Sequence, residues 1–220
     1  MSEPIRYSAE DEPSRALAAA DPAMAALIAR VGSVEFTPSL IGSRFSALVR
    51  GVTGQQLSGA AAERIYQRLN DAVGITPEVL ASASDEELVG VGLSHRKAEY
   101  TRDLARAVLS GELALDSFDD CSDDEIVDLL TSQRGIGPWT AHMFLRFSLR
   151  LPDVIAPGDL GILQAVGRLL ELGREATAAE VTEAAERWKP HRSAATFYLY
   201  RDAGMGRPGD APDGKATKTG

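Results

Sequence analysis

Apolar side chains recur at the three- and four-residue spacing of amphipathic helices along most of the chain. Strict alternation, the mark of a half-buried strand, is missing, including over residues 1–33, and Gly and Pro fall mainly between the apolar stripes. The pattern predicts about ten helices with short connections and little or no sheet, which is an all-α fold. The clearest stripes are Leu40/Phe45/Leu48/Val49, Ile65/Tyr66/Leu69, Tyr100/Leu104/Val108 and Ile126/Leu129/Leu130.

Helix starts are marked by capping sequences. Three capping boxes, in which a hydroxyl and a glutamate three residues later satisfy each other's backbone amides, begin at Ser84, Ser122 and Thr177. Thr76 followed by Pro77 marks a fourth start. Residues 204–220 are rich in Gly and Pro and show no apolar period, which predicts a disordered tail.

Composition narrows the class of protein. The chain has 220 residues, of which 44% are hydrophobic and 25% charged, as in an ordinary globular protein. The one cysteine, Cys121, cannot form an internal disulfide or a zinc–thiolate site by itself. No apolar run is long enough to cross a bilayer, and the first residues lack the pattern of a secretory signal. We therefore expect a cytoplasmic protein that does not enter a membrane.

The net charge of −9 argues against nucleic acid as a partner, because nucleic-acid binders usually present a basic face. Binding needs only a local face, however. Residues 134–201 contain nine Lys and Arg against seven Asp and Glu, whereas acid is concentrated in "AEDEP", "SDEE" and "DDCSDDE". The sequence thus allows a weakly basic face on an acidic body.

A short glycine-containing loop separates two predicted helices, over residues 122–132 and from Pro138 to about 149. Ile136 between Gly135 and Gly137 can turn inward and anchor the loop, while amides near Gly137 point outward at the start of the second helix. Such a helix start is an anion site, and this arrangement is the helix-hairpin-helix pattern that grips a DNA phosphate. An ordinary helix–helix corner is the alternative.

A single carboxylate, Asp159, follows Pro157 and Gly158 and precedes another helical pattern. By position it is a helix N-cap, and that role alone would explain it. Asp153 can likewise be an ordinary loop carboxylate. Asp159 becomes a candidate for chemistry because it follows the hairpin by about 20 residues, so that both can face one bound strand.

Taken together, four stretches resemble the helix-hairpin-helix Gly/Pro-Asp superfamily of DNA glycosylases, and most closely its AlkA-type 3-methyladenine DNA glycosylase II branch. These are "GQQLSGAAAERIYQRL" (54–69), "GLSHRKAEYTRDLARAV" (92–108), "RGIGPWTAHMFL" (134–145) and "ERWKPHRSAATFYLY" (186–200). The second is similar to the pattern G-x-S-x-x-K-A-x-Y-x-x-x-L-A. The resemblance covers roughly residues 35–202.

The resemblance implies an all-helical fold of two lobes with a cleft for DNA between them. Residues 1–42 and 152–203 would form lobe A and residues 43–151 lobe B. The chain is too short for the N-terminal β domain of longer AlkA-type members, so we expect none.

The resemblance also assigns roles to residues. Asp159 falls on the catalytic aspartate, and Gln56, with its neighbour Gln55, on the wedge that fills the gap left by a flipped base; a polar loop is the alternative for both glutamines. Gly135, Ile136, Gly137 and Thr140 would bind phosphate, although Thr140 can instead bond within its helix. The pocket for the base would be lined by Trp139, Met143, Leu160 and Tyr200.

Trp139 stands where related bifunctional enzymes carry a lysine nucleophile, and it cannot form a Schiff base. The resemblance therefore implies a monofunctional glycosylase without lyase activity. Trp139 offers a face for a cationic base, with core packing as the alternative. Arg192 and Lys189 either contact phosphate or form a solvated helix start.

The expected function is excision of alkylated bases, such as 3-methyladenine and 7-methylguanine, from double-stranded DNA by a monomer. Alternatives are a glycosylase for deaminated or mismatched bases and a non-catalytic binder of damaged DNA. No cofactor is expected to be required. The family's hairpin also binds a monovalent cation, here through the backbone carbonyls of Thr131, Gln133 and Ile136, which leave no side-chain signature.

Overall fold

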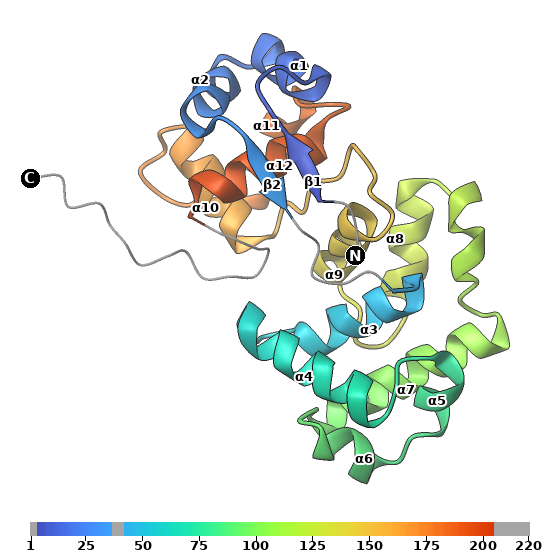
Figure 1. The fold of residues 1–220 in the computed structure, drawn as a ribbon. Helices are drawn as coiled ribbons and strands as arrows, with labels where there is room; N and C mark the ends of the chain where they lie inside the picture. The colour runs from blue at the N-terminus through green and yellow to red at the C-terminus, as the bar shows by residue number, and fades with distance from the viewer. Residues whose placement is uncertain (1–3, 37–41, 205–220) are drawn as a thin grey trace, which may run out of the picture. The chain divides into compact units, whose positions relative to one another are not determined.

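The computed structural model describes residues 4–36 and 42–204, which fall into two compact units (Figure 1). Unit 1 contains residues 42–151, and unit 2 contains residues 4–36 and 152–204. The chain thus begins in unit 2, builds unit 1 and returns to unit 2. From the sequence we place the boundaries at 42/43 and 151/152, a division that stays a prediction, and the predicted disordered tail from 204 lies outside the described residues except for Gly204 itself.

Unit 1 is helical throughout its described residues. It contains seven α-helices and a 3-10 helix, η1, and its buried helical side chains come mainly from α3, α7 and α9, with a smaller share from α4. The elements are α3 (Arg44–Gly54), α4 (Gly59–Ala72), α5 (Pro77–Ser82), α6 (Asp85–Gly90), α7 (His95–Ser110), η1 (Leu115–Asp120), α8 (Asp123–Thr131) and α9 (Pro138–Phe147).

Unit 2 has five helices and a two-stranded antiparallel sheet in which Ile5 pairs with Phe36 and Tyr7 with Val34. Its centre is α12, in which every residue from Ser193 to Tyr200 is buried. The Phe197 ring lies 4.6 Å from that of Phe36, measured between centroids. The elements are β1 (Ile5–Tyr7), α1 (Glu12–Ala20), α2 (Pro22–Val31), β2 (Val34–Phe36), α10 (Leu160–Leu169), α11 (Ala178–Glu186) and α12 (Arg192–Asp202).

The predicted helix starts are confirmed. Ser84, Ser122 and Thr177 each accept a hydrogen bond from the N3 amide, and Glu87, Glu125 and Glu180 each accept one from the N-cap amide. Thr76 caps α5, with Pro77 in its first turn. Local capping chemistry therefore fixes where these helices begin, independently of what they pack against.

The described residues are predominantly helical, as predicted, with three local differences. Residues 5–7 form a strand that the sequence did not signal, because three residues are too few to show alternation and the partner strand is far along the chain. In α7 the predicted stripe is confirmed only at Leu104, because Tyr100 and Val108 are partly exposed and the rest of the buried face is Ala98, Thr101, Ala105 and Ala107. Leu129, predicted as core, is exposed, and Leu40 lies outside the described residues.

Candidate functional site

The loop between α8 and α9 forms the predicted hairpin. Its turn is closed by the Ile136 amide, which donates to the Gln133 carbonyl at 3.1 Å, and the Ile136 side chain is buried. Gly137 is the N-cap of α9, with Pro138 in the first turn. Because Gly137 has no side chain to accept a bond, the first amides of α9 have no side-chain cap and form a helix start suited to an anion.

The two glycines of the hairpin serve different needs. Gly135 has a positive φ of 87°, and a Cβ there would come within 2.2 Å of the Tyr100 ring of α7. Gly137 has an ordinary backbone conformation and no atom within 4 Å of the position a Cβ would take. Gly135 therefore allows close packing, while Gly137 keeps the helix start accessible.

The arginine of the hairpin is held by unit 1 itself. Arg134 donates to the Asp103 carboxylate at 2.8 Å, and its guanidinium lies 5.7 Å from the centroid of the Tyr100 ring. These contacts offset the one positive charge of residues 133–137. Phosphate binding at this hairpin would consequently rest on backbone amides.

Gln55 and Gln56 occupy a tight turn after α3. Gln55 has extended dihedrals (φ −55°, ψ 135°), Gln56 has a positive φ of 59°, and the Leu57 amide donates to the Gly54 carbonyl at 3.2 Å. This is the pattern of a type II β-turn, whose third residue is most often glycine. The exposed Gln56 side chain is thus presented from a backbone conformation that disfavours side chains, as is common at functional positions.

Two predicted site residues, Gln55 and Thr140, have hydrogen-bond partners within unit 1. The Gln55 amide donates to the Gly135 carbonyl at 2.7 Å and to the Thr140 hydroxyl at 3.2 Å, so Gln55 braces the hairpin, and its wedge role stays a prediction. Thr140 is buried and its hydroxyl accepts a hydrogen bond from Gln55, while its contact with a phosphate stays a prediction.

Asp159 is the N-cap of α10, as its position predicts. Its Oδ1 accepts a hydrogen bond from the Ile162 amide at 3.1 Å, and its own amide donates to the Ala156 carbonyl at 3.0 Å. The residue is only 4% exposed. Cap and burial hold the carboxylate in one position, which a group that acts on a substrate requires.

The chain that leads to Asp159 is tied to the start of α12. Arg192 binds both carboxylate oxygens of Asp153, at 2.8 and 3.0 Å, and the Val154 amide donates to the Ser193 hydroxyl at 3.1 Å. The Ser193 amide donates to the Pro152 carbonyl at 3.0 Å. Arg192 thus has a structural partner within unit 2, and Lys189 pairs with Glu186 at 2.8 Å, a solvated ion pair.

The four predicted pocket residues have very different surroundings. Trp139 and Met143 lie four residues apart on one face of α9 in unit 1, and both are partly exposed. In unit 2, Leu160 is 59% exposed next to Asp159, whereas Tyr200 is fully buried, with its ring centroid 6.4 Å from that of Phe36. A base would reach Tyr200 only if its neighbours moved, and the pocket roles of all four stay predictions.

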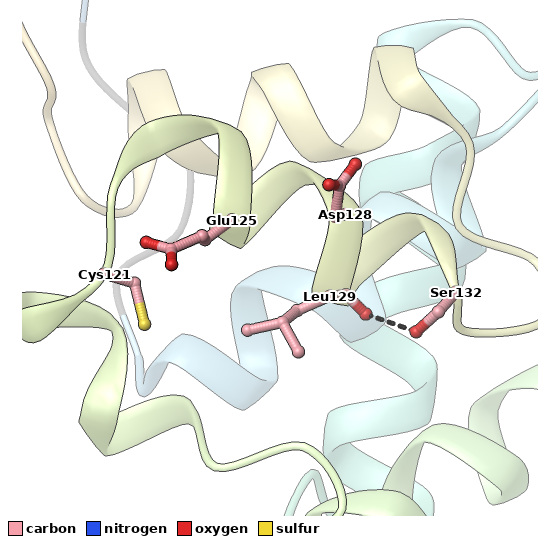
Figure 2. A pocket seen from close by; sticks show the side chains of 5 residues that line it. All are labelled: Cys121, Glu125, Asp128, Leu129 and Ser132. Carbon is pink, nitrogen blue, oxygen red and sulfur yellow. Dashed lines mark hydrogen bonds between the residues drawn. The ribbon is translucent and has the colours of Figure 1, made fainter.

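A hollow of about 440 Å³ lies beside α8, lined by Cys121, Glu125, Asp128, Leu129 and Ser132 (Figure 2). Figure 2 shows Glu125 and Asp128 among the side chains that line it and the Ser132 hydroxyl bonded to the Leu129 carbonyl. Two carboxylates repel phosphate, so this hollow does not suit a nucleotide.

Among residues 4–36 and 42–204, no three His, Cys, Asp or Glu side chains gather in a way that could hold a metal ion. The carbonyl site suggested for a monovalent cation is compatible with the hairpin. Thr131 ends α8, and the Gln133 carbonyl accepts one bond and has a second lone pair to offer.

Residues 49–191 match the model of the HhH-GPD superfamily of base excision DNA repair proteins. The chain belongs to this superfamily. The matched range contains the Gln56 turn, the hairpin and Asp159, so all three parts of the candidate site lie within the residues that match the superfamily model.

Individual superfamily members are similar over most of the chain. A DNA-3-methyladenine glycosylase of Bacillus subtilis is 32% identical over 71% of this chain and 56% of its own length, and DNA-3-methyladenine glycosylase 1 of Schizosaccharomyces pombe is 33% identical over 71% of each. The structure of the S. pombe 3-methyladenine DNA glycosylase Mag1 in complex with abasic DNA gives a TM-score of 0.81 at 29% identity, covering 89% of this chain and 98% of that one.

The chain spans little more than half the length of the B. subtilis relatives that it matches. Among its described residues, no helix is both long and apolar enough to cross a membrane. The superfamily fold and the helix-hairpin-helix motif were predictable from the sequence. The brace from Gln55 and the role of Tyr100 under Gly135 were not, although the K-A-x-Y part of the quoted pattern marked α7 as distinctive.

Proposed function

We propose that this protein is a DNA glycosylase that flips alkylated bases out of double-stranded DNA and hydrolyses their N-glycosidic bond. The observation that carries the proposal is Asp159, a buried carboxylate held by the Ile162 amide at the start of α10. The open helix start at Gly137, the Gln56 turn and the 3-methyladenine glycosylases among the relatives support it.

In the proposed reaction the target base leaves the stack, because its glycosidic bond cannot be reached inside a duplex. The departing base takes the electrons of the bond, and positive charge develops on the sugar. The Asp159 carboxylate stabilises that charge and accepts a proton from the water that attacks the sugar carbon. An alkylated purine is already cationic and needs little protonation to leave, so one carboxylate suffices.

The lack of lyase activity is part of the proposal. Strand cleavage by this superfamily's bifunctional members needs an amine that forms a Schiff base, and Trp139 at the corresponding position has none. Its indole instead provides a surface on which a cationic base can stack.

The remaining parts follow from the same site. Gln56 would fill the space of the flipped nucleotide, and a monovalent cation bound by the carbonyls of Thr131, Gln133 and Ile136 would add positive charge near the phosphate. The protein would act as a monomer in the cytoplasm, with double-stranded DNA as its partner.

A release assay on DNA with defined lesions tests the proposal. Wild type should release 3-methyladenine and leave abasic sites. The strands at these sites should stay intact until alkali is added. Asp159→Asn should slow release by about 10²–10⁴-fold, the range of a positioned acid–base group. Since Asn caps helices as well as Asp, this variant should stay folded and keep its affinity for DNA.

Each alternative has its own outcome in that assay. Release of hypoxanthine or uracil in preference to 3-methyladenine would favour a glycosylase for deaminated bases. Unchanged release by Asp159→Asn would contradict the mechanism, and tight binding without release by wild type would identify a damage-binding protein. Cleavage of the DNA strand without added alkali would contradict the absence of lyase activity.

A further inference from the structure

One helix of unit 1 contacts both the Gln56 turn and the hairpin. Lys97, in the first turn of α7, donates from Nζ to the carbonyls of Thr53 at 2.8 Å and Gln55 at 2.7 Å. Tyr100 is three residues later on the same helix, and its ring lies against Gly135. Residues three apart lie on one face of a helix, so α7 presents both contacts side by side.

Lys97 is well suited to hold the end of α3. The last carbonyls of a helix lack partners within it, and an ammonium group provides several donors for them. Burial lowers the pKa of the Lys97 ammonium, and the structure gives that ammonium two carbonyl acceptors. The Gln55 carbonyl is the one that precedes Gln56, so this contact acts directly on the turn.

Gln55 closes the connection from the other side. Its backbone carbonyl binds Lys97, while its side-chain amide binds the Gly135 carbonyl and the Thr140 hydroxyl. Gln55 therefore connects the Gln56 turn to α7 and to the hairpin, all within unit 1. The positive φ of Gln56 increases the need for such support, because a side chain there is disfavoured by the backbone.

We propose that Gln55 and Lys97 are positioning residues that lock the Gln56 turn to the hairpin, so that the wedge enters DNA at a fixed distance from the gripped phosphate. The proposal rests on the proposed DNA-glycosylase function. Neither residue contacts the reacting atoms. Both act through Gln56, and α7 and the hairpin provide the rigid frame.

A double-substitution cycle tests the action through Gln56. Gln55→Ala should slow release of 3-methyladenine about tenfold, because it removes two uncharged hydrogen bonds, to the Gly135 carbonyl and to the Thr140 hydroxyl. Gln56→Gly removes the wedge and suits the turn. In that background Gln55→Ala should cost less than about twofold, since no wedge is left to position. Equal costs in the two backgrounds would overturn the proposal.

The control for this cycle is Gln67→Ala. Gln67 is an exposed glutamine that bonds to Asp71 within α4, and its loss should leave release unchanged. Gln55→Ala should also keep its affinity for undamaged DNA, because Tyr100 still supports Gly135. A parallel loss of that affinity would show that Gln55 acts through the phosphate grip alone, and would overturn the positioning role.

A second experiment needs no DNA. Amide hydrogen exchange is measured in the unbound protein at Leu57, which bonds to Gly54 in the turn, and at Ile136, which bonds to Gln133 in the hairpin. Gln55→Ala should speed exchange at both amides, Lys97→Met chiefly at Leu57, and Gln67→Ala at neither. Unchanged exchange in the first two variants would refute the lock.

The two experiments separate the possible failures. A wild-type protein that releases no base and does not bind abasic DNA would refute the proposed glycosylase, while the exchange measurement would still decide whether Gln55 and Lys97 join the turn to the hairpin. If wild type is active and the effects of Gln55→Ala and Gln56→Gly on release are additive, only the positioning role is refuted.

Discussion

The hairpin and the Asp159 turn are built in different ways. The hairpin offers backbone amides, and its shape depends on Tyr100 from α7 and on its own buried Ile136, while Gln55 from the α3 end links it to the Gln56 turn. The Asp159 turn offers one side chain, capped by the α10 amide of Ile162. A backbone site is distributed over the residues that shape it, whereas a side-chain site can lose its chemistry by one substitution and keep its fold. Substitutions in the two regions should therefore have different signatures.

The largest effect on stability is expected for Gly135→Ala. A methyl group there would overlap the Tyr100 ring, and the positive φ is unfavourable for any residue with a Cβ. We expect a loss of about 2–4 kcal/mol in the free energy of unfolding, the sum of a left-handed backbone and overpacking. Urea unfolding measures it. A stability within about 0.5 kcal/mol of wild type would show that Tyr100 moves aside at little cost.

Arg192→Met tests the support behind Asp159. Both partners of the Arg192–Asp153 pair have side chains that are 24% exposed, so its loss should cost about 1–2 kcal/mol and slow base release by loosening the chain before Asp159. Arg6→Met is the control, since the Arg6–Glu35 pair is more exposed and should contribute under about 1 kcal/mol. Equal costs for the two variants would mean that the Arg192–Asp153 pair gives Asp159 no support.

Gly137→Ala should have the opposite effects to Gly135→Ala, with little loss of stability and a clear loss of DNA affinity. With open space at the Cβ position, the stability cost should stay under about 1 kcal/mol, the difference between Gly and Ala at an N-cap. The methyl group would stand where a phosphate approaches, so affinity for DNA should fall about tenfold, or 1.4 kcal/mol. Fluorescence anisotropy at fixed salt measures this affinity. A variant that is unstable yet binds normally would contradict the assignment of the two glycines.

The smallest effect is expected on thermal stability at low pH, at a residue outside both regions. Arg174 and the Thr177 amide lower the pKa of Glu180 to about 2. A carboxyl whose pKa is lowered on folding stabilises the fold above its ordinary pKa, and this stabilisation is lost as the pH falls from near 4.5 to about 2. The Tm of wild type should exceed that of Glu180→Gln slightly at pH 6 and converge with it near pH 2. A constant difference would contradict the assignment.

Local signals made much of the fold predictable. Each capping box forms as its residues indicate, and α9 begins at Pro138. The strand over Ile5–Tyr7 was missed because its pairing with residues 34–36 is a long-range contact. The buried face of α7 was predicted only at Leu104, because small residues such as Ala98 and Ala105 form most of it, while the larger Tyr100 supports the hairpin.

The candidate site likewise has parts that the sequence predicts and contacts that only packing creates. Asp159 and the two glycines stand out in the sequence because turns and caps are local. The brace from Gln55 depends on a contact 80 positions along the chain, and only packing brings its amide to the Gly135 carbonyl. The sequence places Gln55 beside Gln56, but it does not show that Gln56 adopts a positive φ or that the Gln55 amide bonds to the hairpin.

The central claim is that the hairpin binds DNA and Asp159 performs the chemistry. The most direct test is one paired measurement, the single-turnover release of 3-methyladenine at saturating protein together with affinity for abasic DNA, on Asp159→Asn and Gly137→Ala. We predict that Asp159→Asn loses release and retains affinity, while Gly137→Ala loses affinity and retains release at saturation. Release by Asp159→Asn at the wild-type rate, or loss of both properties in both variants, would contradict the claim.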